Sequence, residues 1–394
     1  MAVRMKDIAQ DLGVSIVTVS KVLHNHKDIG AATRARVLRR MKELNYQPSL
    51  AAQGLASNQS FMVGLIVPDL VHSFFSEVAQ SLCGVIRRKG FGLVISSSNG
   101  DRRLEQEEIS LMVRRRVDVL ILASCQDDSK GLREVAKEVP LILLDRRFKD
   151  IEVNFVGTDD VAVGQMATEH LIQMGHKRIA HIGDRNATTG LGRLQGYKEA
   201  LSRRKIAVSE KYIVHGSLSN ESADTAGRRA MEKLLKLRPR PDAVFCYNDP
   251  AAIGAMNAII AAGLRIPEDV AIIGSGNIRY AESFKVPLST VAQSRSALGE
   301  AVGELALQLT ANKESKRHKS IVIQPELIVR ESSKSKPRWK LRISALSKPR
   351  DGSSFSHRLA GTSGRERRAR NQKRNGQPSV NCRGVIDPRL FRAV

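Results

Sequence analysis

The chain has few cysteines and no long apolar run. Only four of its 394 residues are cysteines, and none stands in a CxxC pair or a Cys/His cluster. Neither a disulfide framework nor a zinc site is therefore expected, and no metal or other cofactor is assigned. No apolar run approaches the roughly 20 residues of a membrane helix. The opening residues, MAVRMKDIAQ, lack the apolar stretch of an export signal, so we expect a cytoplasmic protein without a membrane partner.

The sequence also lacks the common signatures of enzyme active sites. It contains no P-loop, no GxSxG elbow and no GxGxxG after an expected strand. Glycine-containing turns such as GLGRLQG are too weak to indicate a phosphate site alone, and no His and acidic residue stand at a catalytic spacing. We therefore expect no enzymatic activity and no catalytic residues.

Acidic residues are outnumbered at both ends of the chain. Residues 334–394 contain 17 Lys and Arg against three Asp and Glu, and residues 1–60 contain nine against four. The net charge of the whole chain is +24, yet the residues between these ends are close to neutral. Basic ends indicate a polyanionic partner, although such tails are sometimes only solvated charge.

Residues 5–23, MKDIAQDLGVSIVTVSKVL, predict two short helices joined by a tight turn. Gly13 suits the left-handed residue that ends a helix, and Ser15 suits the cap that begins the next one. Val19, Val22 and Leu23 share one helical face, whereas a strand would bury alternate residues. This arrangement is a helix-turn-helix. A third helix is expected over AATRARVLRRMKELNY, with Val37, Leu38, Met41 and Leu44 facing inward.

The second helix would expose Ile16, Val17, Ser20 and Lys21. The N-terminal end of such a helix commonly enters the major groove of DNA. There Lys21 can reach guanine or a phosphate, while Ile16 and Val17 can contact thymine methyl groups. The alternative is a structural three-helix domain with a solvated basic face.

The middle of the chain alternates apolar, β-branched runs with longer amphipathic segments, which is typical of a parallel α/β sheet. A helix is predicted over residues 77–89, and a break near residue 160 indicates two doubly wound lobes. The segment IVIQPELIVRES ends the periodic part, and residues 334–394 are predicted to be disordered. The expected strands lie in FMVGLIVP, GFGLVISSS, VDVLILAS, VPLILLD, KRIAHIGD, PDAVFCYND and DVAIIGSG.

The segments MKDIAQDLGVSIVTVSKVLHN and TRARVLRRMKELNYQPSLAAQGLASNQS resemble the N-terminal domain and hinge of the LacI–GalR family of bacterial transcription regulators. The similarity continues to residue 333, and its most specific part is NYQPSLAAQGLA. It implies an all-α helix-turn-helix domain at residues 1–47, a hinge at 48–60, and a two-lobed α/β core resembling periplasmic binding proteins at 61–333. It also implies a homodimer that binds a palindromic double-stranded DNA operator, usually as a repressor.

The resemblance assigns base reading to three residues and phosphate contacts to six. The base readers are Ile16, Val17 and Lys21; the phosphate contacts are Ser15, Thr18, Ser20, Asn25, Thr33 and Tyr46. His24 and Gly30 depart from the family, where Asn and Ser or Thr are usual. These departures put individual contacts in doubt but leave the docking mode unchanged.

The hinge, SLAAQGLA, is too short to be a stable isolated helix. We expect it to order only when two copies pack together over DNA. By resemblance, Leu55 is the wedge that enters the minor groove. The alternative is a flexible linker with an exposed leucine.

Open α/β sheets bind ligands beyond the C-terminal ends of their strands. The candidate effector-binding residues there are Asp69, Phe74, Phe75, Asp145, Arg193, Asn248, Asp249 and Gln293. The resemblance maps Phe74, Asp145, Arg193, Asn248 and Gln293 onto ligand contacts of the family. Arg, Asp and Asn side chains beside an aromatic ring suit a sugar-like effector. The alternative for Asp145 and Asp249 is that they only cap the helices that follow them.

The cleft departs from the family more than the DNA-binding part does. Ser275, Gly276 and Asn277 stand where an acidic pair is common, and Ser222 stands where an aromatic residue is common. Both departures weaken the case for a standard hexose. A solute-binding protein or a sugar-related enzyme would share the two-lobed fold, and binding of a palindromic duplex would separate the regulator from both.

Overall fold

The computed structural model describes residues 3–24, 26–47, 54, 57–185, 188–216, 221–312 and 317–334. Most of the predicted hinge (residues 48–53, 55 and 56) and nearly all of the predicted tail (residues 335–394) lie outside them.

Three short helices form the N-terminal module (residues 3–47). They are α1 (Met5–Leu12), α2 (Ile16–Leu23) and α3 (Ala31–Glu43). Gly13 ends α1 with φ 63°, and the Ser15 hydroxyl caps α2 by accepting a hydrogen bond from the Thr18 N–H at 3.0 Å. The predicted helix-turn-helix is therefore confirmed.

The module has a small apolar core of its own, which α1, α2 and α3 all line. Its buried members are Ile8, Ala9, Val19, Val22, Val37 and Met41. The prediction that Leu38 faces inward is wrong, since its side chain is 50% exposed. Leu38 lies about 100° around the helix from the buried Val37, and the buried face of α3, which carries Val37 and Met41, does not extend to it.

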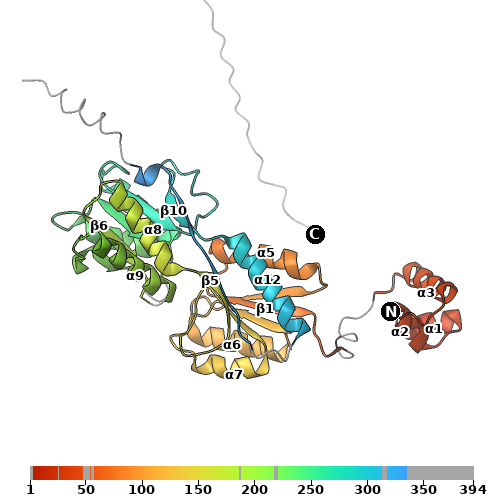
Figure 1. Ribbon diagram of the computed structural model, residues 1–394. Helices are drawn as coiled ribbons and strands as arrows, with labels where there is room; N and C mark the ends of the chain where they lie inside the picture. The colour runs from red at the N-terminus through yellow and green to blue at the C-terminus, as the bar shows by residue number, and fades with distance from the viewer. Residues whose placement is uncertain are drawn as a thin grey trace, which may run out of the picture. The chain divides into compact units, whose positions relative to one another are not determined.

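The first lobe is a six-stranded parallel sheet covered by helices on both faces. Its strands are β1 (Met62–Val67), β2 (Gly92–Ser97), β3 (Val119–Leu122), β4 (Leu141–Leu144), β5 (Asn154–Thr158) and β11 (Ser320–Ile323), in the order β11-β5-β4-β3-β1-β2. Its helices are α5 (Ser73–Arg87), α6 (Arg102–Arg114), α7 (Lys130–Glu138) and α12 (Arg295–Ala311). Helices α5 and α12 pack on one face of the sheet, and α6 and α7 on the other (Figure 1).

The second lobe repeats this plan with one reversed strand. Its strands are β6 (Ile179–Gly183), β7 (Ile213–His215), β8 (Ala243–Cys246), β9 (Ala271–Ser275), β10 (Ser289–Ala292) and β12 (Glu326–Ile328), in the order β12-β10-β9-β8-β6-β7. Its helices are α8 (Asp160–Gln173), α9 (Thr188–Arg203), α10 (Ala223–Leu235) and α11 (Asp249–Ala261). Only the edge strand β12 is antiparallel among the strand pairs described.

The chain passes between the two sheets three times, after β5, after β10 and after β11. Each lobe is therefore assembled from segments that are distant in sequence. Within the second lobe, α8 and α9 touch through their backbones. A Cβ atom on Gly164 would lie 2.1 Å from the backbone oxygen of Arg193, so only glycine fits there. This contact fixes α9, and with it Arg193, against the start of α8.

The predicted α/β fold class is confirmed. The seven predicted strands are found as β1, β2, β3, β4, β6, β8 and β9. The sequence pattern did not reveal β5, β7 and β10, and it gave the region of β11 and β12 only as the segment that ends the periodic part. The helix predicted over residues 77–89 is α5, which begins at Ser73 and ends at Arg87.

Candidate nucleic-acid interface and ligand cleft

The first turn of α2 is open to solvent and carries two large apolar side chains. Ile16 is 46% exposed and Val17 is 63% exposed. Beside them, the hydroxyl oxygens of Ser15 and Thr18 lie 2.9 Å apart. The N-terminus of a helix carries a partial positive charge that attracts phosphate. This turn therefore combines apolar groups that can contact bases with polar groups that can contact a DNA backbone.

Lys21 lies one turn further along α2 and already has a partner. Its ammonium group forms an ion pair with the carboxylate of Asp28 at 2.5 Å, and both side chains are partly exposed. The hydrogen bond from Lys21 lowers the pKa of Asp28. Asp28 lies in the connection between α2 and α3.

Of the other predicted DNA contacts, three lie within the described residues and two do not. Ser20, Thr33 and Tyr46 are half-buried, and burial raises the pKa of Tyr46. Asn25 and Leu55 lie outside the described residues.

Arg193 lies at the centre of a buried charge cluster between the strand ends. Its side chain is almost completely buried. Its Nε and Nη2 atoms lie 3.0 and 2.9 Å from Oδ1 of Asp160, and Nη1 donates to the backbone oxygen of Tyr247 at 2.5 Å. The guanidinium fork that the sequence analysis assigned to a ligand is thus engaged within the second lobe. Sequence reasoning missed Asp160, although it stands in the segment GTDDVAVG directly after β5.

Asp145 follows β4 of the first lobe and faces the same cluster. Its backbone has a left-handed conformation with φ 65°, which is strained for a residue with a Cβ. Its Oδ1 atom is buried and has no hydrogen-bond partner among the described residues. Burial raises the pKa of Asp145, and the positive charges of Arg193 and Arg146 oppose that shift. Burial also raises the pKa of Asp160, against the opposing charge of Arg193. One guanidinium therefore pairs with Asp160 and also acts through its charge on Asp145.

Asn248 and Asp249 begin α11 and have different environments. The Asn248 side-chain oxygen caps the helix by accepting from the Ala251 N–H at 2.8 Å, and a side-chain hydrogen bond also joins Asn248 to Tyr247. Asp249 is completely buried and accepts from the Thr290 hydroxyl at 2.7 Å and the Ile278 N–H at 2.9 Å. The prediction that Asp249 contacts a ligand is corrected, because its carboxylate joins loop and strand inside the lobe.

The two phenylalanines after β1 both pack on the core of the first lobe. Phe74 is 5% exposed and packs in the core of the first lobe, and its assignment as a ligand contact stays a prediction. Phe75 is half-buried, and its ring lies 5.8 Å from that of His72. Asp69 is exposed and accepts from the Val71 N–H at 2.7 Å.

The charges of two arginines act on the imidazole of His72. Burial lowers the pKa of His72, and the positive charges of Arg193 and Arg295 act in the same direction, whereas Asp69 opposes them. Arg295 is the first residue of α12 and follows the second passage between the lobes.

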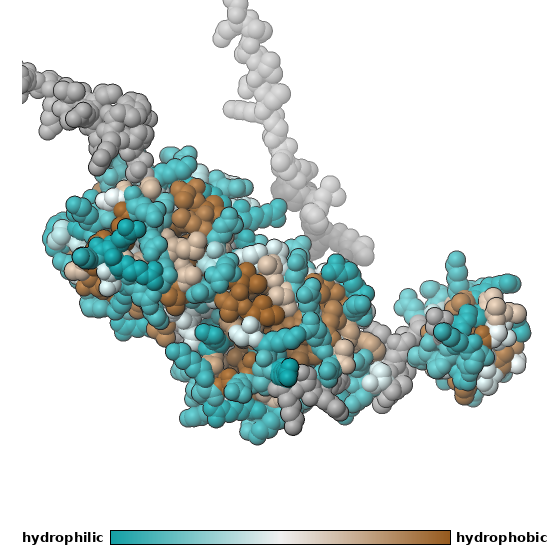
Figure 2. Space-filling view, viewed as in Figure 1, coloured by the Kyte–Doolittle hydropathy of each residue, from teal (hydrophilic) through white to brown (hydrophobic). Residues whose placement is uncertain are grey.

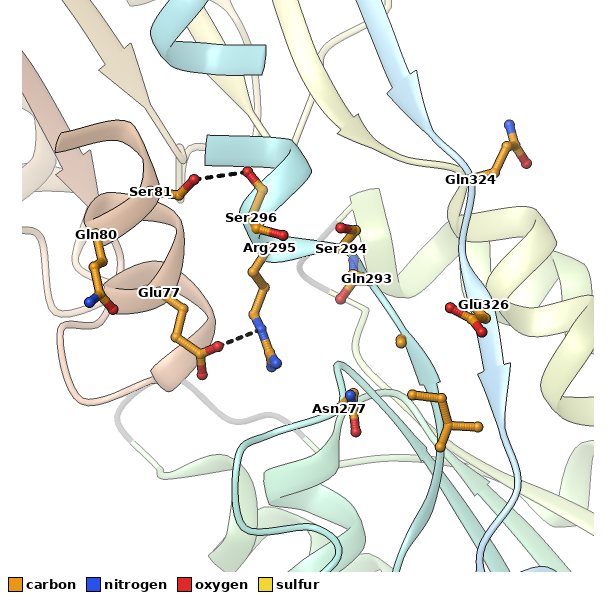
Figure 3. A pocket seen from close by; sticks show the side chains of 12 residues that line it. Glu77, Gln80, Ser81, Asn277, Gln293, Ser294, Arg295, Ser296, Gln324 and Glu326 are labelled. Atoms are coloured by element: carbon orange, nitrogen blue, oxygen red, sulfur yellow. Dashed lines mark hydrogen bonds and ion pairs between the residues drawn. The ribbon is translucent and has the colours of Figure 1, made fainter. Parts of the chain in front are cut away.

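A polar pocket of about 540 Å³ surrounds Arg295. Arg295 Nε lies 2.9 Å from Oε2 of Glu77 in the first lobe, and its Nη1 donates to the backbone oxygen of Gly276 in the second lobe at 2.8 Å. Gln293 is 5% exposed, and its Nε2 atom is buried without a partner among the described residues. Figure 3 shows Arg295 between Glu77 and Asn277, with Gln293 close by. The remaining lining includes Gln80, Ser81, Ser294, Ser296, Gln324 and Glu326.

The predicted effector residues thus lie in different surroundings, with Asp69 exposed and Phe75 half-buried. Asp145 and Arg193 meet in the charge cluster, and Gln293 lines the polar pocket. Asn248 stands next to Tyr247, whose backbone oxygen binds Arg193. Phe74 and Asp249 are interior. Glu77 and Arg295 were missed by sequence reasoning because only the three-dimensional structure brings α5 and α12 together.

The described part of the chain contains no group of three or more His, Cys, Asp and Glu side chains that could hold a metal ion. Within the same residues, none of the helices combines the length and apolar character needed to cross a membrane.

Two known families match this chain in order along its length. Residues 4–49 match the family described as bacterial regulatory proteins, lacI family, and residues 168–333 match the periplasmic binding protein-like domain. The chain is 32% identical over 333 residues to the HTH-type transcriptional repressor PurR of Mannheimia succiniciproducens, covering 84% of this chain and 98% of that protein. It is 33% identical over 329 residues to the ribose operon repressor of Haemophilus influenzae, covering 83% and 98%.

Solved structures agree with these matches. The lac repressor dimer bound to operator and the anti-inducer ONPF is similar with a TM-score of 0.76 and 26% identity, covering 85% of this chain and 100% of that chain. The complex of the transcriptional regulator CelR with cellobiose is similar with a TM-score of 0.64 and 28% identity, covering 84% and 99%. The expected family is confirmed, and with it the expectation of a regulator rather than an enzyme. The chain belongs to the LacI family of bacterial regulatory proteins.

Proposed function

We propose that the protein is a transcriptional repressor that binds a palindromic operator as a homodimer. Its operator affinity changes when a small, uncharged effector binds between the lobes. The observation that carries the DNA-binding part is the capped α2, whose first turn exposes Ile16 and Val17 beside Lys21. The protein works in the cytoplasm, where DNA binding associates it with the nucleoid.

In this proposal residues 1–47 read the DNA, residues 48–60 form the hinge, and residues 61–333 bind the effector. Base contacts come from Ile16, Val17 and Lys21. Phosphate contacts come from Ser15, Thr18, Ser20, Asn25, Thr33 and Tyr46. Leu55 is the minor-groove wedge of the hinge. The basic residues 334–394 add non-specific DNA affinity, so deleting residues 337–394 should reduce the salt dependence of binding.

The chemistry of the cleft favours an uncharged, hydroxyl-bearing effector. Arg193 and Arg295 each donate to a carboxylate and to a backbone oxygen, so neither presents an unused fork to a ligand carboxylate or phosphate. Instead the cleft offers a buried acceptor on Asp145 and a buried donor on Gln293. A hydroxyl group can donate to the first and accept from the second. The resemblance to a ribose operon repressor and to a cellobiose-bound regulator supports a carbohydrate.

Exposed apolar residues support a homodimer. Figure 2 shows apolar patches on the surface of both lobes. Among the described residues, Val71 is 92% exposed, Leu70 is 51% exposed and Ile260 is 55% exposed. Apolar surface of this kind commonly marks an interface with another protein, and a twofold dimer matches a palindromic operator.

The DNA-binding proposal is tested by selecting duplexes from a random library with the full-length chain. We expect enrichment of an inverted repeat, and loss of that enrichment when Ile16 and Val17 are both replaced by Ala. The matched control replaces the similarly exposed Leu38 of α3 with Ala and should keep the enrichment. Selection of unrelated sequences without an inverted repeat would contradict the proposal.

The effector proposal is tested by thermal unfolding with D-ribose, cellobiose and D-ribose 5-phosphate. We expect stabilisation by an uncharged sugar, and loss of it in the Asp145→Asn and Arg193→Ala variants. Stabilisation by ribose 5-phosphate but not by either uncharged sugar would show that the cleft selects anions.

A further inference from the structure

The four carboxylates of the N-terminal module all form ion pairs, and one pair differs from the rest. Three pairs lie on α1 and α3 or join these two helices: Arg4 with Asp7, Arg40 with Asp11, and Arg40 with Glu43. The fourth joins Lys21 of α2 to Asp28. Asp28 is therefore the one carboxylate in the described part of the module that engages the helix with the exposed apolar turn.

Lys21 and Asp28 both remain within reach of a partner. The Lys21 side chain is 40% exposed and that of Asp28 is 54% exposed. Lys21 follows Val17 by four residues, so the two side chains share one face of α2. A duplex docked against that face would meet the ammonium group of Lys21 and the carboxylate of Asp28 together.

The ammonium group of Lys21 can contact either Asp28 or a group on the DNA. Exposed ion pairs contribute little to stability, so a good contact in the groove can replace the one to Asp28. A guanine offers two acceptors, N7 and O6, whereas non-specific docking offers mainly phosphates. Asp28 competes with phosphates for Lys21 and also repels them. Its charge therefore opposes non-specific docking more than docking at a site where Lys21 finds a guanine.

We propose that Asp28 is a specificity-determining residue that withholds Lys21 from DNA phosphates through their ion pair. The inference rests on the proposed DNA-binding function. Asp28 affects specificity through its contact with Lys21, and it needs no contact of its own with a base.

The test measures binding of the full-length chain to a random-sequence duplex between 50 and 200 mM salt. For Asp28→Asn we expect about three- to tenfold tighter binding, because the competing charge is removed. The plot of log affinity against log salt should become steeper by about 0.9, the value for one additional phosphate contact. Asp28→Glu keeps the charge and should behave like the wild type.

Two controls isolate the ion pair from a general charge effect. Asp11→Asn removes an ion-paired carboxylate of similar exposure that faces α3, and it should change the salt slope much less. In a Lys21→Ala background, Asp28→Asn should change the slope much less, because the released ammonium group is absent and only the direct repulsion of phosphates by Asp28 is lost. Unchanged circular dichroism spectra would show that the module remains folded in each variant.

Three results would overturn the inference: an unchanged slope in Asp28→Asn, equal changes in Asp28→Asn and Asp11→Asn, or a full Asp28→Asn effect without Lys21. Each would leave the proposed DNA binding intact. A wild-type chain that ignores duplex DNA at low salt would instead overturn the proposed function, and this inference with it.

Discussion

The N-terminal module and the ligand cleft use the same types of charged residue in opposite ways. The module holds Lys21 and Asp28 at its surface, with each side chain at least 40% exposed. The cleft holds Arg193 and Asp160 with side chains only 6% and 14% exposed. An exposed pair can exchange partners at small cost, whereas breaking a buried pair leaves an uncompensated charge. The module is therefore suited to switching between protein and DNA contacts, and the cleft to holding fixed positions for a ligand.

The largest expected effect follows from removing the buried cation. Arg193→Ala should lower the free energy of unfolding of the lobes by about 3–5 kcal/mol, because Asp160 would remain buried without its partner. Urea unfolding followed by circular dichroism measures this loss. The matched control is Arg203→Ala on the same helix, whose side chain is 56% exposed and pairs at the surface. If both variants lose the same stability, the contrast between buried and exposed pairs is wrong.

The next effect concerns the contact that positions Arg193. Gly164→Ala should cost about 1–3 kcal/mol of unfolding free energy, because the new Cβ would collide with the Arg193 backbone oxygen. Gly131→Ala in α7 is the control, since no atom lies within 4 Å of its added Cβ. Equal thermal unfolding temperatures for the two variants would argue against the close approach of α8 and α9.

A smaller effect depends on pH. The folded-state pKa of Asp145 is raised, so its ionised form destabilises the folded protein as pH rises above the unfolded value of about 3.8. Asp145→Asn should therefore gain stability relative to the wild type at pH 8, by about 1 kcal/mol, and gain less at pH 5. Asp150 has a lowered pKa, mainly through the Ser129 hydroxyl, so Asp150→Asn should lose stability, and by the same amount at both pH values, because that contribution disappears only as pH falls below the unfolded value of 3.8. Urea unfolding at both pH values measures the difference, and a gain for Asp145→Asn that does not depend on pH would contradict the raised pKa.

The smallest effect compares two helix caps. Ser15→Ala should cost the N-terminal module about 1 kcal/mol and weaken DNA binding, while the lobes keep their stability. Asp101 caps α6 by accepting from the N–H groups of Arg103 and Leu104. Asp101→Ala should therefore destabilise the first lobe and leave the stability of the N-terminal module unchanged. Hydrogen exchange resolved by region measures both losses. Effects that spread equally over module and lobes would show that the two regions do not unfold independently.

The module was predictable from sequence because its signals are local. Gly13 and Ser15 stand next to the turn that they shape, and the apolar residues of α1 and α2 repeat within a few positions. Leu38 was misassigned because periodicity alone does not say how wide the buried stripe is. The strands β5, β7 and β10 were not predicted because they are short and include polar residues. Their sequences are NFVGT, IVH and STVA.

The cleft was predictable only in part because its geometry is non-local. Arg193 and Asp145 were identified, but the engagement of the Arg193 fork by Asp160 depends on the contact between α8 and α9. Asp249 was misassigned for a similar reason. Its burial depends on Thr290 and Ile278, which are far away in sequence. Arg295 and Glu77 meet only because the chain returns to the first lobe after β10.

The three passages between the lobes have a consequence for synthesis of the protein. The first lobe needs α12 and β11, which end at residues 311 and 323, whereas the N-terminal module is complete by residue 47. Because chains emerge from the ribosome N-terminus first, the DNA-reading module can fold long before either lobe is complete. A chain interrupted before residue 320 would therefore retain the module without β11 and β12, and its DNA-reading helices would not be coupled to a finished ligand cleft.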